Sequence, residues 1–413
     1  MRTAGTAQGL TLVALGSLPT LAIAALVPVL PALFAHFGGV PHAQLLVPMV
    51  LTVPSLCVAL FSSPIGAAAD RWGRRPILLA ALVAYGIFGL APFLFEGIYS
   101  IIGSRFVVGI AEAAILTIGN ALMGDYFAGP ARQKWLGLQV SLGPFVGTGY
   151  ILAGGALGNW SWHGPFLLYL MGLVVLAFAW FTLHEPTAGE AAAGAGSARS
   201  TAGAEEPGQV ASEPASSPFP WRTTLVIGSV TLLVSVIYFL QAVQHGRIFS
   251  DLGVTKPSTI SVVVSIASMG TVIGGLAYRR IGGWRVAALL AIVFAGYGVG
   301  YLGVSRSPNY LVGMGFDAIG QFAGGVAIPV LIAWALDSYD FRHRGRGMGI
   351  WAACFFLGQF LSPPVVTLIG RVTPGFLPSV GTLGVIALGC AVVAFLLRAK
   401  GAAGAGTAAA GVR

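Results

Sequence analysis

Residues 11–35 read TLVALGSLPTLAIAALVPVLPALFA, and they belong to an uncharged run that decides the fold class. No Asp, Glu, Lys or Arg occurs among the 67 residues from Thr3 to Ala69. A helix crosses the ~30 Å hydrocarbon core of a bilayer with about 20 residues, so this run holds two spans. The turn-rich segment 36–42 (HFGGVPH) separates them. The first span follows the single Arg2 and is interpreted as a membrane helix, not as a cleavable signal peptide.

The overall composition also indicates a lipid environment. Of the 413 residues, 56% are hydrophobic and 8% are charged, whereas a soluble domain has ~25% charged residues. The mean hydropathy is +0.86. This composition excludes a large water-soluble protein and also excludes intrinsic disorder, which requires low hydrophobicity and high charge. Backbone groups in lipid must be satisfied internally, and the apolar runs are continuous, so we expect helices and not the alternating strands of a barrel.

Ten further apolar segments bring the predicted number of membrane helices to twelve. They are 76–95, 99–127, two within 136–184 separated at 158–165, 223–246, 257–278, 286–305, 309–336, 347–370 and 372–397. The predicted fold is an all-α membrane protein of two six-helix pseudo-repeats. We expect an N-terminal six-helix bundle over 1–184, a cytoplasmic flexible linker over 185–220, a C-terminal bundle over 221–400 and a disordered tail over 401–413, because the linker and tail are rich in Ala, Gly, Ser and Pro.

The basic residues predict the orientation. With both termini in the cytoplasm, 17 of the 22 Lys and Arg residues fall in cytoplasmic segments, as the positive-inside rule requires. The net charge of +9 is then explained by loop residues that face anionic lipid. We therefore expect the lipid bilayer as a partner and no nucleic acid. We also expect a monomer in a bacterial inner (plasma) membrane.

The two halves of the chain resemble each other. Residues 66–75 read GAAADRWGRR and residues 275–284 read GLAYRRIGGW, at an offset of 209. Asp125, Arg132 and Gly137 recur as Asp337, Arg344 and Gly349 at an offset of 212. This near-constant offset indicates an internal repeat of six helices. Parallel repeats of this kind occur in transporters, with the substrate site at their interface near the membrane midplane.

At the first of these segments the chain resembles the major facilitator superfamily. The matching positions in the family's loop signature, G-x-x-x-D-R-x-G-R-[RK], are Gly66, Asp70, Arg71, Gly73, Arg74 and Arg75. In the family this cluster latches the two halves and affects gating, so the resemblance implies a gating motif here. The second copy has Arg279 in place of Asp70, which predicts a one-sided latch. The physical alternative is that the arginines only anchor the topology.

Two charged residues lie within the fourth predicted span. Arg105 and Gly109 resemble the family's helix 4 signature, in which the Arg is tied to proton coupling. Glu112 falls near the midplane, two helical turns from Arg105 at a separation of ~10.5 Å along the axis. Removal from water favours the neutral form of a carboxyl, so Glu112 is the first candidate for a proton carrier. The alternative is a structural carboxyl that is satisfied by a neighbouring hydroxyl.

Asp317 is the only other acid deep in a span. Three roles are open from the sequence: a second titrating group in proton coupling, a partner for Arg105 or Arg247, or a cap in a wet vestibule. Helix 1 lacks the acid that many proton-driven drug exporters carry.

The fifth span contains a motif that resembles the family's G-P-x-x-G-G signature of antiporters. The matching residues are Gly143, Pro144 and Gly147, whereas Thr148 replaces the last glycine. Proline kinks a helix and glycines permit close helix packing. The pair Pro28 and Pro31 in the first span also resembles drug exporters.

Aromatic and amide side chains on the later spans are candidates for substrate binding, because such surfaces suit an amphipathic organic molecule. They are Tyr238, Gln241, Gln244, His245, Gln321, Phe355, Phe356 and Gln359. For any single phenylalanine, packing against lipid or another helix is the favoured interpretation, whereas amides rarely face lipid.

No pattern predicts catalysis. Cys57, Cys354 and Cys390 are isolated, and neither a metal-binding spacing nor a phosphate-binding loop occurs, so we expect no enzyme, no catalytic residue, no metal and no cofactor. The sequence favours a secondary transporter that exports a small amphipathic organic compound or drug in exchange for protons. The alternatives are a proton-coupled symporter that imports a sugar, organic acid or other metabolite, and a uniporter or transporter of lipid-like substrates. A receptor or intramembrane enzyme is the remaining possibility.

Overall fold

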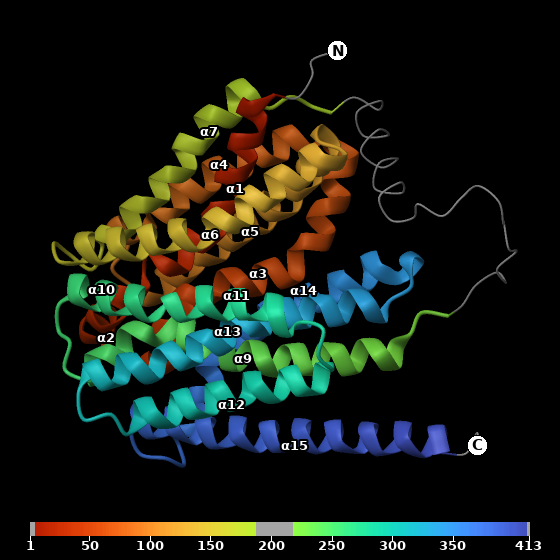
Figure 1. The fold of residues 1–413 in the computed structure, drawn as a ribbon. Coiled ribbons are helices and arrows are strands. Elements are labelled where there is room, and N and C mark those ends of the chain that lie inside the picture. Colours follow the sequence, from red (N-terminus) through yellow and green to blue (C-terminus); the bar gives the residue numbers. More distant parts are fainter. Residues whose placement is uncertain (1–4, 187–217, 411–413) are drawn as a thin grey trace, which may run out of the picture. The chain divides into compact units, whose positions relative to one another are not determined.

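A computed structural model describes residues 5–186 and 218–410, without the side chains of residues 341, 342 and 398–410. All regular elements in these ranges are helices (Figure 1). The first half contains α1 (Thr6–Ala24), η1 (Val27–Val29), α2 (Leu30–Phe37), α3 (Ala43–Trp72), α4 (Arg74–Gly89), η2 (Ala91–Phe93), α5 (Ile98–Tyr126), α6 (Gly129–Gly158), η3 (Gly164–Leu170) and α7 (Met171–Thr182). The second half contains α9 (Trp221–Asp251), α10 (Pro257–Ala267), α11 (Met269–Ile281), α12 (Val286–Ser305), α13 (Tyr310–Ser338), α14 (Phe341–Ile369) and α15 (Phe376–Ala410).

These elements form twelve stretches in the described ranges that are long and apolar enough to cross a membrane. The predicted all-α class and the twelve membrane helices are therefore confirmed. Most of the expected linker lies outside the described residues, as do 411–413 of the expected tail, whereas α15 continues through residues 401–410.

Prolines account for the break in the first span. Pro28 and Pro31 lack the N–H that an α-helix needs, and the chain passes through the short η1 between α1 and α2. Pro144, by contrast, lies inside α6, which continues through it. The hydroxyl of Thr148 donates to the Pro144 carbonyl at 2.9 Å, so this position is bonded within its own helix.

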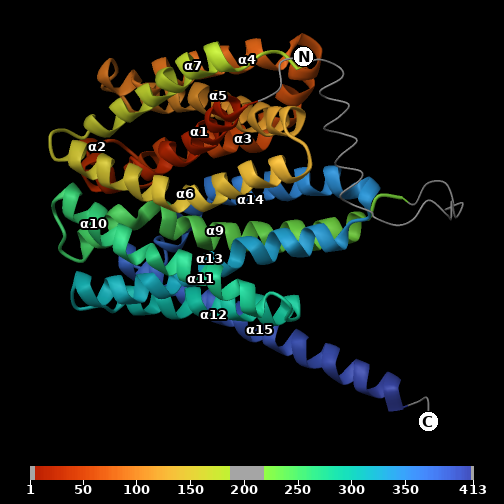
Figure 2. The ribbon, with the colours of Figure 1, turned by 45° about the horizontal axis from the view of Figure 1, so that its top comes forward.

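The described chain divides into two compact units that do not coincide with its two halves. Unit 1 is Met1–Ala25, Val53–Tyr150 and Pro165–Trp221, and unit 2 is Leu26–Thr52, Ile151–Gly164 and Arg222–Arg413, in each case within the described residues. In unit 1, α4 packs against α5 and α7, and α1 packs against the same two helices (Figure 2). The buried phenols of Tyr85 on α4 and Tyr169 on η3 donate to the α1 carbonyls of Leu18 and Ala22 and so attach α1 to these two elements.

Unit 2 has its core around α12, which packs against both α13 and α15 (Figures 1 and 2). Val293, Tyr297 and Tyr301 of α12 are almost fully buried. Beside this core, α11 and α13 approach so closely that no side chain fits between their backbones. A Cβ atom on Gly325 would lie 2.1 Å from the Thr271 carbonyl oxygen, and one on Gly274 would lie 2.1 Å from the Phe322 carbonyl oxygen. Close backbone contact at small residues is the usual way in which membrane helices associate.

Candidate functional site

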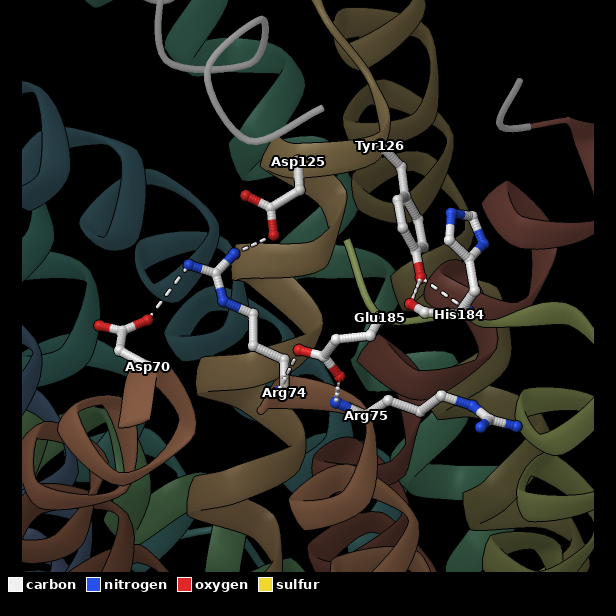
Figure 3. A network of polar contacts seen from close by, with 7 residues as sticks. All are labelled: Asp70, Arg74, Arg75, Asp125, Tyr126, His184 and Glu185. Carbon is white, nitrogen blue, oxygen red and sulfur yellow. Dashed lines mark hydrogen bonds and ion pairs between the residues drawn. The ribbon is translucent and has the colours of Figure 1, made fainter. Parts of the chain in front are cut away.

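A cluster of polar side chains gathers at one end of unit 1, around the predicted gating motif (Figure 3). Arg74 lies between two acids: its Nη2 is 3.2 Å from Asp70 Oδ1, and its Nη1 bonds Asp125 Oδ2 at the end of α5. Asp70 is mostly exposed, whereas Asp125 is largely buried. The Asp125 contact is therefore less screened by water and is the stronger of the two.

Glu185, just after α7, binds the start of α4. Its two carboxylate oxygens accept from the backbone N–H groups of Arg74 at 2.7 Å and Arg75 at 2.8 Å (Figure 3). The first N–H groups of a helix have no partner within it and carry a partial positive charge. Gly73 makes this approach possible, because its φ of +95° lies in the left-handed region and an added Cβ would lie 3.3 Å from Glu185.

Two further contacts attach the end of α7 to this cluster. Arg75 donates to the Trp180 carbonyl at 2.9 Å, and its guanidinium lies 5.5 Å from the Trp180 ring. The Tyr126 hydroxyl donates to the His184 carbonyl and accepts from the His184 N–H (Figure 3). The cluster thus joins the ends of α3, α4, α5 and α7.

The structure adds four residues to the predicted motif: Asp125, Tyr126, His184 and Glu185. Of these four, only Asp125 could be singled out from the sequence, because it belongs to the internal repeat. The other three match no motif and lie far along the chain from residues 66–75. Arg71 makes no contact with the cluster among the residues that the structure describes, and its guanidinium lies 6.0 Å from the neighbouring Trp72 ring. Gly66 approaches α5, where an added Cβ would meet the Thr117 methyl at 3.5 Å.

Arg105 is completely buried in unit 1. Its Nη2 donates to the α4 carbonyls of Phe88 at 2.7 Å and Gly89 at 3.0 Å. The guanidinium also lies 4.8 Å from the Tyr169 ring and 5.2 Å from the Phe166 ring. Within residues 5–186 and 218–410, carbonyl oxygens and aromatic faces, and no carboxylate, contact and stabilise this cation.

Glu112 is also buried, with 4% of its surface exposed, and its Oε1 has no hydrogen-bond partner. In the described ranges it makes no ion pair with Arg105, in agreement with the separation of two turns. Burial without a hydrogen-bond partner for Oε1 destabilises the charged form of the carboxyl, so this position suits a group that takes up a proton.

The second buried acid, Asp317, lies in unit 2 and meets residues of α9. Gln241 Nε2 donates to Asp317 Oδ1 at 2.6 Å and to the Asp317 carbonyl at 2.8 Å. His245 Nε2 is 3.1 Å from Asp317 Oδ2 and 3.0 Å from Gln321 Nε2. The Thr271 hydroxyl donates to Gln321 Oε1 at 2.6 Å. The structure therefore joins Asp317 to three residues that were predicted for substrate binding.

Arg247 is not the partner of Asp317. Its guanidinium lies between two rings, 4.5 Å from Phe34 and 4.1 Å from Phe376. Arg247 lines a cavity of about 400 Å³ together with Pro31, Phe34 and Asp251. It also lines a second cavity of about 250 Å³ together with Gln244 and Arg371.

The predicted aromatic surface forms where α9 meets α14. Phe355 contacts the rings of Tyr238, Phe239, Trp351 and Phe356, with centroids 5.1 to 6.3 Å apart. Tyr238, Phe355 and Phe356 are half-buried, as expected for rings that border a cavity or lipid.

Two predicted amides stay outside the Asp317 network. Gln244 and Gln359 are buried, and Gln244 Oε1 has no hydrogen-bond partner.

The motif on α6 makes few contacts within unit 1. A Cβ atom added to Gly143 would have no neighbouring atom within 4 Å. Pro144 is exposed. Gly147 faces α1, where the Thr20 methyl lies 3.4 Å from the Cβ position. Gly143 and Pro144 therefore leave their part of α6 open within the unit, whereas Gly147 is buried against α1.

Comparisons with known proteins agree in fold and in broad class. The sequence profile of the Major Facilitator Superfamily matches residues 12–316 and 248–411. The tetracycline resistance protein, class C, of Escherichia coli is 28% identical over 380 residues, which are 86% of this chain and 87% of that protein. The bacillibactin exporter of Bacillus subtilis (strain 168) is 24% identical over 384 residues, which are 86% and 88% of the two chains.

Solved structures support the same fold. The inward-open xylose transporter XylE from E. coli has a TM-score of 0.70 at 13% identity, covering 94% of this chain and 95% of that one. The nucleoside transporter NupG has a TM-score of 0.69 at 12% identity, covering 95% and 98%. At these identities the similarity shows the fold alone.

Proposed function

Because the chain belongs to the Major Facilitator Superfamily, we propose that it is a proton-coupled exporter of a small amphipathic organic compound. Membership confirms the resemblance seen in the sequence, and it makes the protein a multi-pass membrane transporter and not an enzyme. The finer proposal concerns the direction of transport, the class of substrate and the coupling ion.

The observation that carries the coupling is the environment of Glu112. A carboxyl in the interior of a membrane span, with one oxygen unpartnered and no ion pair in the described residues, can take up a proton and lose its charge. Arg105 is held two turns away by carbonyl groups and rings, so its positive charge remains available to respond to the charge of Glu112.

The relatives support export of an organic compound. One of them is named for the export of bacillibactin and another for resistance to tetracycline, and both align over more than four fifths of this chain. The half-buried rings of Tyr238, Phe355 and Phe356, with the buried amides of Gln244 and Gln359, are proposed to contact the substrate.

The loop cluster is proposed to govern switching between conformations. Its ion pairs and helix cap join the ends of α3, α4, α5 and α7, so that these ends move together. Gly143, Pro144 and Gly147 are proposed as the face of α6 that packs against a partner helix during transport. We retain as proposals the six-plus-six domain division, the cytoplasmic termini, the bacterial inner membrane, the monomer and the lack of nucleic-acid binding.

The test is flux in proteoliposomes that hold the purified full-length protein under an imposed pH gradient. The probes are tetracycline and a panel of amphipathic dyes, with the direction of movement recorded. Glu112→Gln should reduce proton-driven flux to the level of empty liposomes while the protein still elutes as a folded species. Glu96→Gln, at an exposed position of the loop before α5, is the matched control and should transport normally.

Two results would contradict the proposal. Unchanged proton-driven flux in Glu112→Gln would remove the assigned carrier. Uptake of the probe together with protons would show a symporter in place of an exporter.

A further inference from the structure

A buried histidine and a buried acid face each other in unit 2, whereas Glu112 belongs to unit 1. His245 Nε2 lies 3.1 Å from Asp317 Oδ2, and the two side chains are 4% and 1% exposed. They come from α9 and α13, 72 positions apart in the sequence. Both groups can change their charge by gaining or losing a proton.

Among the described residues, His245 is the basic side chain that faces the Asp317 carboxylate. Within the described ranges no Lys or Arg lies within ion-pair distance of the Asp317 carboxylate, and Arg247 is held between Phe34 and Phe376. A buried carboxylate without a counter-charge is strongly disfavoured. A neutral imidazole and a carboxylate together carry one negative charge. The pair becomes neutral only when it binds one additional proton. That proton lies on Nε2 of His245 or on the carboxyl of Asp317.

Gln241 holds Asp317 in place for this exchange. Its amide nitrogen donates to both Oδ1 and the backbone carbonyl of Asp317, so Oδ2 is the oxygen left for His245. Gly320 provides the room, since an added Cβ would lie 2.8 Å from Gln241 Nε2.

Gln321 and Thr271 can satisfy either protonation state of His245. When Nε2 lacks a hydrogen, the Gln321 NH₂ group donates to Nε2 at 3.0 Å. The Gln321 oxygen then accepts from the Thr271 hydroxyl at 2.6 Å. When Nε2 carries a hydrogen, a reversed amide presents its oxygen to His245 and its NH₂ to the hydroxyl. A threonine hydroxyl can donate or accept, so the Gln321–Thr271 pair can match either state of Nε2. Asp317 Oδ2 has no hydrogen-bond partner and lies 3.1 Å from His245 Nε2.

Few other titratable groups face the pair. Tyr297 and Tyr301 of α12 are close enough to interact electrostatically with Asp317, and the Tyr301 hydroxyl donates to the Ile237 carbonyl. On α9 itself, Arg247 and Asp251 follow His245 and interact with each other. The part of α11 beside the pair contributes the neutral Thr271.

We propose that His245 and Asp317 form a second proton-binding site, which takes up one proton from water and releases it again while Gln321 and Thr271 exchange their hydrogen-bonding roles. Only N–H and O–H bonds form and break, and the proton returns to water. The role of this site in transport rests on the proposed proton-coupled function. In that function, the proton bound here is transported in addition to the one bound by Glu112. The site itself can be tested without transport.

The test is an infrared pH titration of the purified full-length protein in lipid nanodiscs, over the pH range in which the protein stays folded. One protonation change should disappear in Asp317→Asn, and the same change should disappear in His245→Gln. Because the two groups share one proton, the double variant should lose no more than either single variant. Additive losses, or a His245 signal that persists unchanged in Asp317→Asn, would overturn the shared site.

A milder variant tests the re-pairing if the pair variants do not fold. Thr271→Val removes the hydroxyl but keeps His245 and Asp317, so the one-proton change should persist at a shifted pH. Thr382→Val is the control, because its hydroxyl bonds only the Pro378 carbonyl of its own helix, and its titration should match the wild type. An unshifted titration in folded Thr271→Val would contradict the role of Gln321 and Thr271.

The proposed function has a separate outcome. If transport is proton-coupled through Glu112, Asp317→Asn should lower the ratio of protons to probe by one in proteoliposomes. If the pair shows its protonation change but the protein shows no proton-driven flux, the proposed function is contradicted and the proton site stands. If Asp317→Asn leaves the ratio of protons to probe unchanged, the site has no part in transport.

Discussion

Replacing Gly325 by alanine tests the close packing of α11 and α13. The added Cβ would lie 2.1 Å from the Thr271 carbonyl oxygen and 2.9 Å from the Gly275 nitrogen. Both are backbone atoms, so no side-chain rotation can relieve the overlap and the two helices must move apart. Because the Thr271 hydroxyl binds Gln321, this movement also disturbs the contacts of His245.

The expected cost follows from two opposing effects. Overpacking in a well-packed interior destabilises by about 1–3 kcal/mol, whereas alanine in place of glycine favours a helix by about 0.5–1 kcal/mol. The net loss of stability is about 1–2 kcal/mol, because the overlap involves backbone on both sides. A loss of this size lowers the melting temperature by roughly 2–8 °C in a unit of about this length.

The assay is size-exclusion chromatography of the detergent-solubilised protein after heating, with the folded peak followed by fluorescence. Gly389→Ala is the matched control, since this glycine lies on α15 in the same unit and an added Cβ would meet nothing within 4 Å. The control should melt at the wild-type temperature or slightly above. Equal melting temperatures for Gly325→Ala and Gly389→Ala would refute the packing derived for α11 and α13.

Three other substitutions have expected outcomes. Glu185→Ala removes the acceptor of two backbone N–H groups at the start of α4, so it should cost about 0.5–1 kcal/mol at this exposed position and speed hydrogen exchange in the first turn of that helix. Arg105→Lys keeps the charge but cannot donate to two carbonyls in the same geometry, so it should cost about 1.5–3 kcal/mol in the melting assay, whereas the exposed Arg306→Lys should not change the melting temperature. Arg247→Lys loses the planar contact with two phenylalanine rings and should cost about 0.5–1 kcal/mol, and an unchanged melting temperature would contradict that contact.

The sequence predicted the membrane helices well because each is a local feature. A span of about 20 apolar residues is visible without knowledge of its neighbours. The same holds for the buried charges, since Arg105, Glu112 and Asp317 stand out inside apolar runs and all three are buried in the structure.

The partners of these charges could not be predicted, because they depend on which helix faces meet. Asp317 was considered as a partner of Arg105 or Arg247, yet it contacts Gln241 and His245. Glu185 lies 110 positions from Arg75, and no periodicity links the end of one helix to the start of another. The prediction that His245 and Gln321 bind substrate rested on their polarity, which is equally consistent with the network that they form.

The two buried acids differ in the cation that accompanies them, and this difference bears on mechanism. Arg105 cannot lose its proton in a protein, and carbonyl groups and rings hold it in place, so of these two buried residues of α5 only Glu112 can change charge. In unit 2, His245 and Asp317 can both change charge. Under the proposed mechanism, a proton that arrives at Glu112 leaves the positive charge of Arg105 without a nearby negative charge, so that this site can attract an anionic or polar group. A proton that arrives at the His245–Asp317 pair makes that pair neutral, so that it no longer attracts a cationic group. The two proposed sites therefore change the local field in different ways when they are loaded.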